Sequence, residues 1–193
     1  QAEDVIRYVA VTGVQTCALP ILLLAIVFII MGWQVSPSYF SLLFYWTALS
    51  LLLVSGAYFF NIAKIFRKRE NGVIPFYIRW AFIPFLLGAQ VYNAWSRKHD
   101  KVPPLQQINE HLFLACRLFP SDIDTLKDNG ITAILDVTCE FDGLEWSSTQ
   151  ENINYLNIPV LDHRVPTRSQ LNQAINWIAH HIKDNRRVVV HCA

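Results

Sequence analysis

A long stretch without ionisable side chains sets the first limit on what this chain can fold into. The segment 8–60 contains no Asp, Glu, Lys, Arg or His. Within it, residues 38–60 approach the ~20 apolar residues that a helix needs to cross a membrane, whereas residues 22–33 are too short to cross alone. A turn is predicted between them, at residues 34–37. Because neither segment has the polar stripe of a soluble core helix, residues 22–60 are predicted to be transmembrane helices.

The start of the chain carries an unusual run. Residues 11–21 read VTGVQTCALPI, which matches the in-frame translation of a common short-read sequencing adapter over all eleven positions. We therefore predict that residues 1–21, Cys17 included, are an assembly artefact without functional weight. A natural loop or a signal-type segment is the alternative. Native genomic reads on both sides of the Ile21–Leu22 junction would contradict the artefact interpretation.

The charges separate the uncharged segment from an acidic half. Residues 61–100 hold seven Lys and Arg against two Asp and Glu, while residues 101–193 hold eight against eleven. This short basic region flanks apolar segments, which suits anionic lipid headgroups better than nucleic acid, so no nucleic-acid partner is predicted. Short loops rich in Lys and Arg stay cytoplasmic. The chain is therefore predicted to be a multi-pass membrane protein whose remaining domain is cytoplasmic.

The segment 74–95 has two possible arrangements. It is long enough to cross a membrane, but it contains two prolines, Arg79 and a glutamine, and basic residues lie on both sides. If it crosses, one basic cluster must be outside. If it lies in the interface or re-enters, both clusters remain cytoplasmic and Arg79 reaches the headgroups, which is the arrangement we favour. Residues 61–104 are thus predicted to be a basic loop, this interfacial or third membrane segment, and a linker ending at Pro103-Pro104.

The remaining residues, 105–193, alternate short apolar strands with helices. Strands are predicted over 111–115, 131–137, 154–160 and 188–190, and helices over 121–130 and 169–183. The first helix is expected to begin at a Ser121 or Asp122 cap and to stop at Gly130. The second has apolar residues at three-and-four spacing. This alternation predicts an α/β domain with a mainly parallel central sheet, whose ligands bind at the carboxyl ends of the strands.

The last strand ends in His191 and Cys192. A strand ending in His-Cys after an amphipathic helix resembles the tyrosine- and dual-specificity phosphatase superfamily, whose signature is His-Cys, five residues, Arg, then Ser or Thr. Only the first two residues of that signature are present. The resemblance extends over about 109–193, because HLFLACRLFPSDIDTLKDNGITAILDVT is similar to the family's entry strand, helix and second strand, and YLNIPVLDHRVP to its acid loop. It implies that 105–193 is the N-terminal part of an incomplete α/β phosphatase domain.

The resemblance also implies roles for three residues. Cys192 would attack phosphorus as a thiolate, and since a free cysteine has a pKa of about 8.5, the family lowers it with backbone N–H groups, a helix N-terminus and an arginine. Asp162 matches the general-acid position, although an Asp that caps a turn before Pro166 is the alternative. His191 would orient the loop or tune the thiolate. No metal or other cofactor is implied.

The other chemically capable side chains receive no catalytic role. Asp136 is predicted to be a structural hydrogen-bonding residue, and Cys116 and Cys139 are predicted to be packed thiols. Predicted to be solvated are Glu140, Asp142, Glu145, Trp146, His163, Arg164, His180 and His181.

The leading functional hypothesis is a membrane-anchored phosphatase that hydrolyses phosphomonoesters of proteins or of phospholipid headgroups through a cysteinyl-phosphate intermediate. The alternative is a non-catalytic membrane protein whose phosphatase-like domain binds phosphorylated partners. Because the phosphate loop and its arginine do not follow Cys192 in this sequence, the chain as it stands is expected to be inactive. A transporter is disfavoured because no clear span carries a charged residue.

Overall fold

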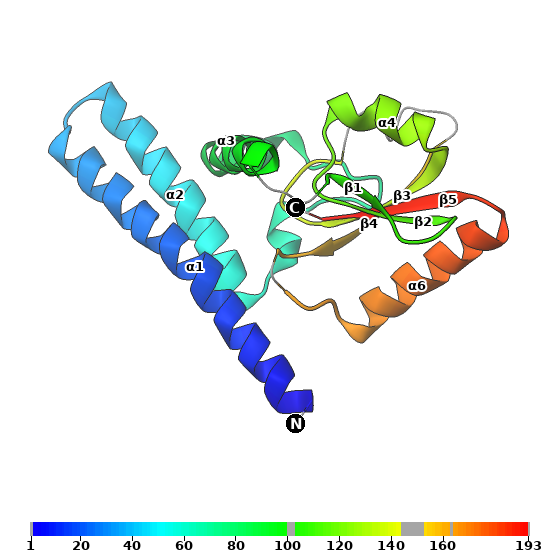
Figure 1. Cartoon of the computed structure of the whole chain (residues 1–193). Helices are drawn as coiled ribbons and strands as arrows, with labels where there is room; N and C mark the ends of the chain where they lie inside the picture. Colours follow the sequence, from blue (N-terminus) through cyan, green and yellow to red (C-terminus); the bar gives the residue numbers. More distant parts are fainter. Residues whose placement is uncertain (1, 100–102, 144–152, 163, 193) are drawn as a thin grey trace.

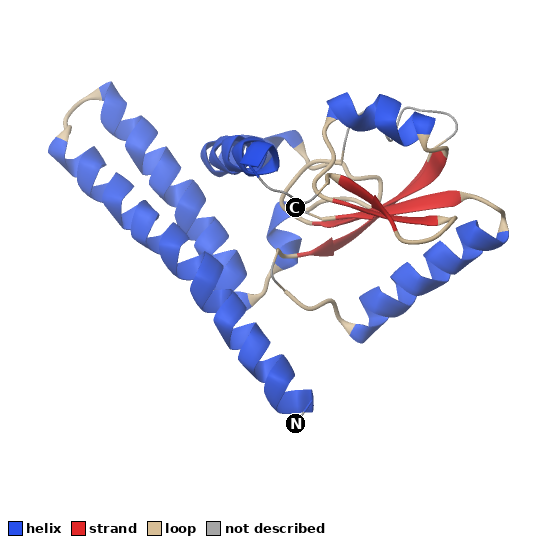
Figure 2. Ribbon diagram, viewed as in Figure 1, coloured by secondary structure: helices blue, strands red, loops and turns tan. Residues whose placement is uncertain are grey.

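The computed structural model describes residues 2–99, 103–143, 153–162 and 164–192, with side chains described from residue 18 onward. Three long helices precede a sheet with helices on both faces (Figures 1 and 2). The helices are α1 (Ala2–Gln34), α2 (Tyr39–Phe60), η1 (Ala63–Phe66), α3 (Phe76–His99), η2 (Pro120–Asp122), α4 (Ile123–Asp128) and α6 (Arg168–Lys183). The strands are β1 (Leu105–Gln107), β2 (Leu112–Ala115), β3 (Ile131–Thr138), β4 (Asn154–Val160) and β5 (Arg187–His191).

The five described strands form one mixed sheet in the order β1-β2-β5-β3-β4. Strands β2, β5, β3 and β4 run parallel, and β1 is antiparallel to β2 at one edge. The predicted mainly parallel α/β fold is therefore confirmed, with the short antiparallel β1 as an addition. Strand β5 lies in the middle, where His191 is level with Ala115 of β2 and Asp136 of β3. The carboxyl ends of these strands consequently meet at one edge of the sheet.

The two faces of the sheet are covered differently. On one face Leu126 of α4 packs with Phe113, Ile134 and Val189 in a closed hydrophobic core. Alternate residues of the same strands point to the other face, where α6 lies (Figure 1). There Leu135 and Val190 line an apolar cavity of about 410 Å³ that separates α6 from the sheet. The apolar stripe predicted on α6 thus faces the sheet but does not pack directly against it. Leu171 and Ile175 of this stripe remain exposed.

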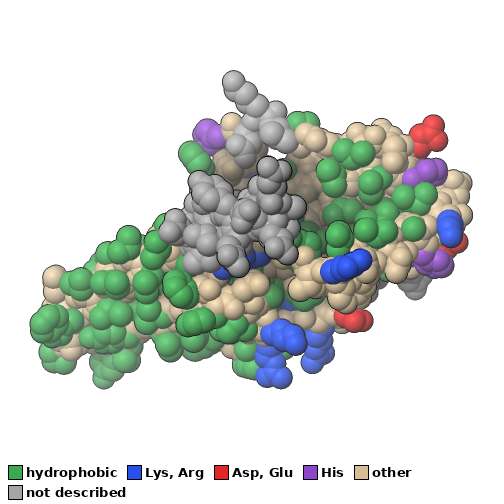
Figure 3. Space-filling view, turned by 90° about the horizontal axis from the view of Figure 1, so that it is seen from below, with side chains coloured by type: hydrophobic (Ala, Val, Ile, Leu, Met, Phe, Trp, Pro, Cys, Tyr) green, Lys and Arg blue, Asp and Glu red, His purple; other side chains and the backbone are tan. Residues whose placement is uncertain are grey.

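Helices α1 and α2 form an antiparallel hairpin that projects from the sheet. The turn predicted at 34–37 is confirmed, and Ser38 caps α2 by accepting a hydrogen bond from the Phe40 N–H. Hydrophobic side chains cover this hairpin, and Lys and Arg side chains gather where it meets the rest of the molecule (Figure 3). In the described part of the chain α2 alone is long and apolar enough to cross a membrane, whereas residues 18–34 of α1 are shorter. The structure therefore supports one candidate span, and the second stays a prediction.

Helix α1 continues without interruption through residues 11–21. Within that run, the Ala18 carbonyl accepts a hydrogen bond from the Ser55 hydroxyl of α2. A helix across these positions does not test their origin, so the adapter interpretation stays a prediction.

The basic segment after α2 is part of the sheet domain and not a free loop. Phe66 and Ile74 are buried, and the Glu70 carbonyl accepts a hydrogen bond from the Asn157 N–H. The Gly72 carbonyl accepts a 2.6 Å hydrogen bond from the Gly143 N–H, at a crossing so close that a Cβ on Gly143 would lie 2.7 Å from the Gly72 Cα. Residues 66–74 therefore pack into the domain about thirty residues before the predicted linker.

Helix α3 is attached to the sheet domain at both ends. Near its start the Arg79 Nε lies 2.8 Å from a carboxylate oxygen of Asp142, and near its end Arg97 makes two hydrogen bonds to Asp122, at 2.6 and 2.8 Å. Asp122 also accepts a hydrogen bond from the Phe119 N–H but none from the first turn of α4. Asp122 is therefore the N-cap residue of α4, as one of the two predicted caps, but its carboxylate makes no capping hydrogen bond to α4 and binds Arg97 instead. The predicted stop at Gly130, with a φ of +64°, is confirmed.

Candidate active site

The residues with candidate chemistry meet at the carboxyl edge of the sheet. Cys192 directly follows the central strand β5, and Asp162 follows β4 by two residues. Both line the 410 Å³ cavity beneath α6, together with Thr138, Glu140 and Arg164. The Cys192 side chain is exposed, as an attacking thiol needs to be. The sequence-predicted pair is thus brought to one cavity from two strands.

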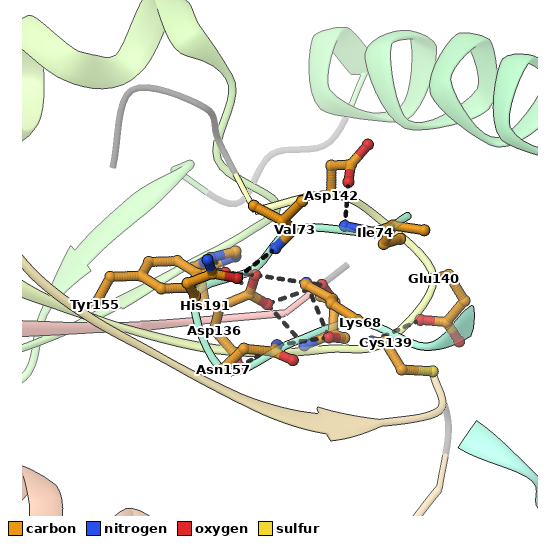
Figure 4. A network of polar contacts seen from close by, with 12 residues as sticks. Lys68, Val73, Ile74, Asp136, Cys139, Glu140, Asp142, Tyr155, Asn157 and His191 are labelled. Carbon is orange, nitrogen blue, oxygen red and sulfur yellow. Dashed lines mark hydrogen bonds and ion pairs between the residues drawn. The ribbon is translucent and has the colours of Figure 1, made fainter. Parts of the chain in front are cut away.

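A buried ion pair lies beside His191, the residue before Cys192 (Figure 4). The Lys68 Nζ contacts Asp136 Oδ2 at 2.7 Å, and neither side chain is more than 1% exposed. The same ammonium donates to the Thr138 carbonyl at 3.0 Å and to the Thr138 hydroxyl at 2.9 Å. The Tyr155 hydroxyl also donates to Asp136 Oδ2, and the Thr138 N–H and hydroxyl each donate to Oδ1 at 2.8 Å. Asp136 is therefore a fully satisfied carboxylate.

Asp136 links this network to the strand that carries the cysteine. Its Oδ1 lies 3.7 Å from the His191 Nε2. Burial opposes ionisation of Asp136, but positive charge at His191 and Lys68 holds its pKa below the ordinary value. Burial lowers the pKa of His191. The prediction that Asp136 is structural fits this geometry. Asp136 thus lies beside His191 and is paired with Lys68 from the segment after α2.

A second buried carboxylate, Glu140, holds the loop that carries Asp162. Glu140 Oε1 accepts hydrogen bonds from the Asp162 N–H at 3.0 Å and from the Tyr58 hydroxyl at 2.8 Å, and Oε2 accepts one from the Cys139 N–H at 3.2 Å. Burial raises the pKa of Glu140, and these hydrogen bonds oppose the rise. The prediction that Glu140 is solvated was wrong, because the carboxylate turns inward to bond two backbone N–H groups and α2.

The Asp162 loop is also bonded to the end of α2 by Arg164. Its guanidinium donates to the Tyr58 carbonyl, one of the last carbonyls of α2, which lack partners within the helix. A cation is favourable at that position because the helix dipole is negative there. Leu161 packs in one cluster with Val54, Phe66 and Phe82 from the helical part. Arg164 was predicted to be solvated, but the loop that carries it packs against the end of α2.

The thiol environment of Cys192 does not yet favour a thiolate. Although Cys192 is exposed, the atoms around it remove part of the water from its thiol, and this partial burial raises its pKa. The negative charges of Asp162, Cys116 and Asp136 raise the pKa further. An attacking cysteine needs the opposite, since the thiolate is the nucleophile. The described residues therefore position this thiol without activating it.

Several other predictions meet the structure with different results. Cys139 is buried as predicted, but Cys116 is exposed. His181 is buried and packs its ring 4.2 Å from that of Trp177, so its prediction as a surface residue was wrong. Glu145, Trp146 and His163 lie outside the described residues. Lys68, Tyr58 and Glu140 were missed as contributors to the site, because long-range pairing of isolated polar residues leaves no periodic signal in a sequence.

Comparisons with known proteins give a family-model match and similar solved structures. Residues 112–193 match the family model described as dual specificity phosphatase, catalytic domain. The chain is also similar to the crystal structure of Tk-PTP in the active form, at 17% identity and a TM-score of 0.42, covering 47% of this chain and 62% of that one. A mutant form of Tk-PTP is similar at 15% identity and a TM-score of 0.38, covering 47% and 61%. The chain thus spans less than two thirds of these proteins.

The family match defines the class of domain. The match over residues 112–193 places this part of the chain in the cysteine-dependent protein phosphatase superfamily.

Proposed function

We propose that the intact protein is a membrane-anchored phosphatase that hydrolyses phosphomonoesters through Cys192. The observation that carries this proposal is the placement of Cys192 and Asp162 in one cavity at the carboxyl edge of a phosphatase-type sheet. The Cys192 thiolate attacks phosphorus, the bond from phosphorus to the leaving oxygen breaks, and Asp162 donates its proton to that oxygen. Asp162 then takes a proton from water, whose oxygen attacks the cysteinyl phosphate and releases phosphate and the thiolate.

Activation of the thiolate has to come from groups beyond those that surround Cys192 here, because these raise its pKa. The resemblance supplies candidates, namely a loop of backbone N–H groups and an arginine after the cysteine. We therefore expect the 193-residue chain to show no turnover of p-nitrophenyl phosphate. Turnover by this chain that disappears in Cys192→Ser would contradict the need for those groups.

The decisive experiment uses the complete protein. Wild type, Cys192→Ser and Asp162→Asn are compared on p-nitrophenyl phosphate, a phosphopeptide and a lipid phosphomonoester. Cys192→Ser should abolish turnover on all of them. Asp162→Asn should lower kcat by about 10²–10⁴-fold, the usual contribution of a general acid, and should remove the limb of the pH profile that reports the acid. Unchanged turnover in Cys192→Ser would refute the mechanism.

Membrane anchoring is supported by α2 and by the two attachments of α3. A single apolar helix of 22 residues fits a membrane span. Because Arg79 and Arg97 bind the same sheet domain at opposite ends of α3, both ends of this helix lie on that domain's side of the membrane. This supports the interfacial or re-entrant arrangement of residues 74–95. Proteolysis of sealed vesicles should cleave tags inserted before Phe76 and after His99 from the same side.

A non-catalytic binding role is the second candidate, because the described residues hold Cys192 in a cavity without lowering its pKa. In that case the complete protein would bind a phosphopeptide or a lipid phosphomonoester without turning it over. An arginine at the end of the phosphate loop distinguishes the two, because the enzyme needs it to stabilise the transition state.

A further inference from the structure

A second apolar cavity also has Asp162 among its lining residues. It has a volume of about 630 Å³ and is lined by residues of α1, α2, α3, the loop after β3 and the loop after β4. Its walls include Phe28 of α1, Leu51 of α2, Phe85 and Gly88 of α3, and Phe141. On α1 the wall includes Pro20 and Ile21 of the adapter-like run as well as Leu24 and Phe28, which follow it. The lining is predominantly apolar, and the volume is in the range of small-molecule sites.

Asp162 connects the two cavities. It lines the 410 Å³ cavity that contains Cys192 and also the 630 Å³ cavity between the helices. A general acid gives its proton to the oxygen of the leaving group. With phosphorus at Cys192 and that oxygen at Asp162, the rest of the leaving group has to extend from Asp162 away from the cysteine. The cavity between the helices is on that path.

We infer that the leaving group is the hydrophobic alcohol of a lipid, so that the substrate is a lipid phosphomonoester whose acyl chain occupies the cavity between α1, α2 and α3. This inference rests on the proposed function, because it uses Cys192 and Asp162 in their proposed roles. It deepens that function by choosing the substrate class.

The surroundings of the cavity suit a lipid. The outward side chains of α2 are exposed and apolar, among them Leu42, Phe59 and Phe60, so a helix that lines the cavity also presents a surface of the kind that contacts acyl chains. Exposed basic residues, Lys64, Arg67 and Arg69, follow the end of α2 directly and match the negative charge of lipid headgroups. A phosphopeptide would instead need polar partners along its backbone, and the apolar lining supplies few.

Two glycines provide a steric test. A side chain added at Gly88 of α3 meets no atom within 4 Å of its Cβ and would project into the cavity. Gly56 of α2 also has open space at its Cβ but does not line the cavity. Gly88→Leu therefore fills the site without forcing the backbone to move, and Gly56→Leu is the matched control for a leucine in an open position of a helix.

The first measurement uses the complete protein in detergent–lipid mixed micelles. The probes are dioleoyl phosphatidic acid, p-nitrophenyl phosphate and a phosphotyrosine peptide. The ratio of kcat/KM for phosphatidic acid to that for p-nitrophenyl phosphate should fall about tenfold or more in Gly88→Leu, equivalent to at least ~1.4 kcal/mol. Gly56→Leu should leave the ratio unchanged. An unchanged ratio in Gly88→Leu, or a preference for the phosphopeptide over phosphatidic acid, would overturn the inference while the proposed phosphatase function stands.

The second measurement does not depend on turnover. Cys192→Ser protein is irradiated with phosphatidic acid that carries a diazirine in its acyl chain, and the attachment site is mapped by mass spectrometry. We expect labelling of α3 around Phe85 and Ala89, and its loss in the Gly88→Leu background. If the complete wild-type protein shows no turnover and the label still attaches around Phe85, the proposed enzyme is refuted and the lipid site is supported. Labelling spread evenly over the outer faces of α1 and α2, with none around Phe85, would refute the lipid site.

Discussion

Asp136 and Glu140 lie four residues apart at the end of β3, are both buried, and are held by opposite kinds of partner. Asp136 is paired with the Lys68 ammonium, and its pKa is lowered. Glu140 accepts hydrogen bonds from neutral groups, the Tyr58 hydroxyl and two backbone N–H groups, and its pKa is raised. Asp136 joins Lys68, in the segment after α2, to the strand of Cys192, and Glu140 joins Tyr58 of α2 to the loop of Asp162. The difference shows that the segment after α2 supports the nucleophile's strand by charge, whereas α2 supports the acid loop by hydrogen bonding.

The largest expected effect is that of Lys68→Met. Removing one partner of a buried ion pair leaves an uncompensated charge at Asp136 and should lower the free energy of unfolding by about 3–5 kcal/mol. Urea denaturation in detergent micelles, followed by tryptophan fluorescence, measures this. The exposed Lys64→Met is the control and should change stability by less than about 0.5 kcal/mol. Adding Asp136→Asn to Lys68→Met should restore part of the loss, and a double variant less stable than Lys68→Met would contradict the charge-based support.

A smaller effect is expected from Gly143→Ala, which tests the crossing that holds the basic segment against β3. The added Cβ would lie 2.7 Å from the Gly72 Cα and 2.5 Å from the Tyr155 hydroxyl. Relief of that overlap has to displace a chain segment or the hydroxyl that bonds Asp136, which should cost about 1–3 kcal/mol. The same denaturation assay applies, with Gly56→Ala as the control. If Gly143→Ala proves as stable as wild type, the two segments do not cross this closely.

Tyr58→Phe should have a still smaller effect on stability, about 1 kcal/mol, because it removes one hydrogen bond from Glu140. In the complete protein the acid loop would lose its link to α2 through Glu140 but keep the bond from Arg164 to the Tyr58 carbonyl, so kcat should fall while the affinity for vanadate, a phosphate mimic, stays nearly constant. The exposed Tyr39→Phe is the control. A Tyr58→Phe enzyme with normal kcat and an unaltered pH profile would mean that Glu140 positions Asp162 without help from α2.

The smallest effect, and the sharpest separation of the two carboxylates, is in the pH dependence of stability. The lowered pKa of Asp136 contributes stability above its ordinary value of 3.8, and this is lost as the pH falls below it. The raised pKa of Glu140 acts oppositely, because its contribution is fully present below the ordinary value of 4.5 and declines as the pH rises above it. The difference in unfolding free energy between wild type and Asp136→Asn should therefore become smaller as the pH falls below 3.8. The difference between wild type and Glu140→Gln should instead become smaller as the pH rises from about 5 to about 8. Parallel changes for both variants would refute the contrast.

The regular part of the fold could be predicted because it leaves periodic signals. The strands over 131–138 and 154–160 and the helix over 168–183 were found within one residue of their observed bounds, from β-branched runs and three-and-four spacing. The edge strand β1, three residues long, was missed because so short a segment has no period. Cys192 and Asp162 were found through a resemblance between motifs, and the structure brings them to one cavity.

Interactions between distant segments could not be predicted in this way. Lys68 stands in a basic cluster that suggests a headgroup contact, yet its side chain is fully buried against a residue 68 positions later. Glu140 belongs to an acidic stretch that suggests solvent, yet it bonds Tyr58 across 82 positions. Local composition predicts only the typical environment of the residues in a segment, and Lys68 and Glu140 are buried where their neighbours suggest exposure.

The sequence by itself determined the division into an uncharged helical part and an α/β part, the mainly parallel sheet and the cysteine at its carboxyl edge. These features follow from local periodicity and from motifs a few residues long. Only the tertiary structure decided that the helical part contributes side chains to the site, that the Asp162 loop docks on α2, and that an apolar cavity continues from Asp162 between the helices. Pairing over such separations depends on which surfaces are left to cover once the helices and strands have packed, and this is a property of the whole fold.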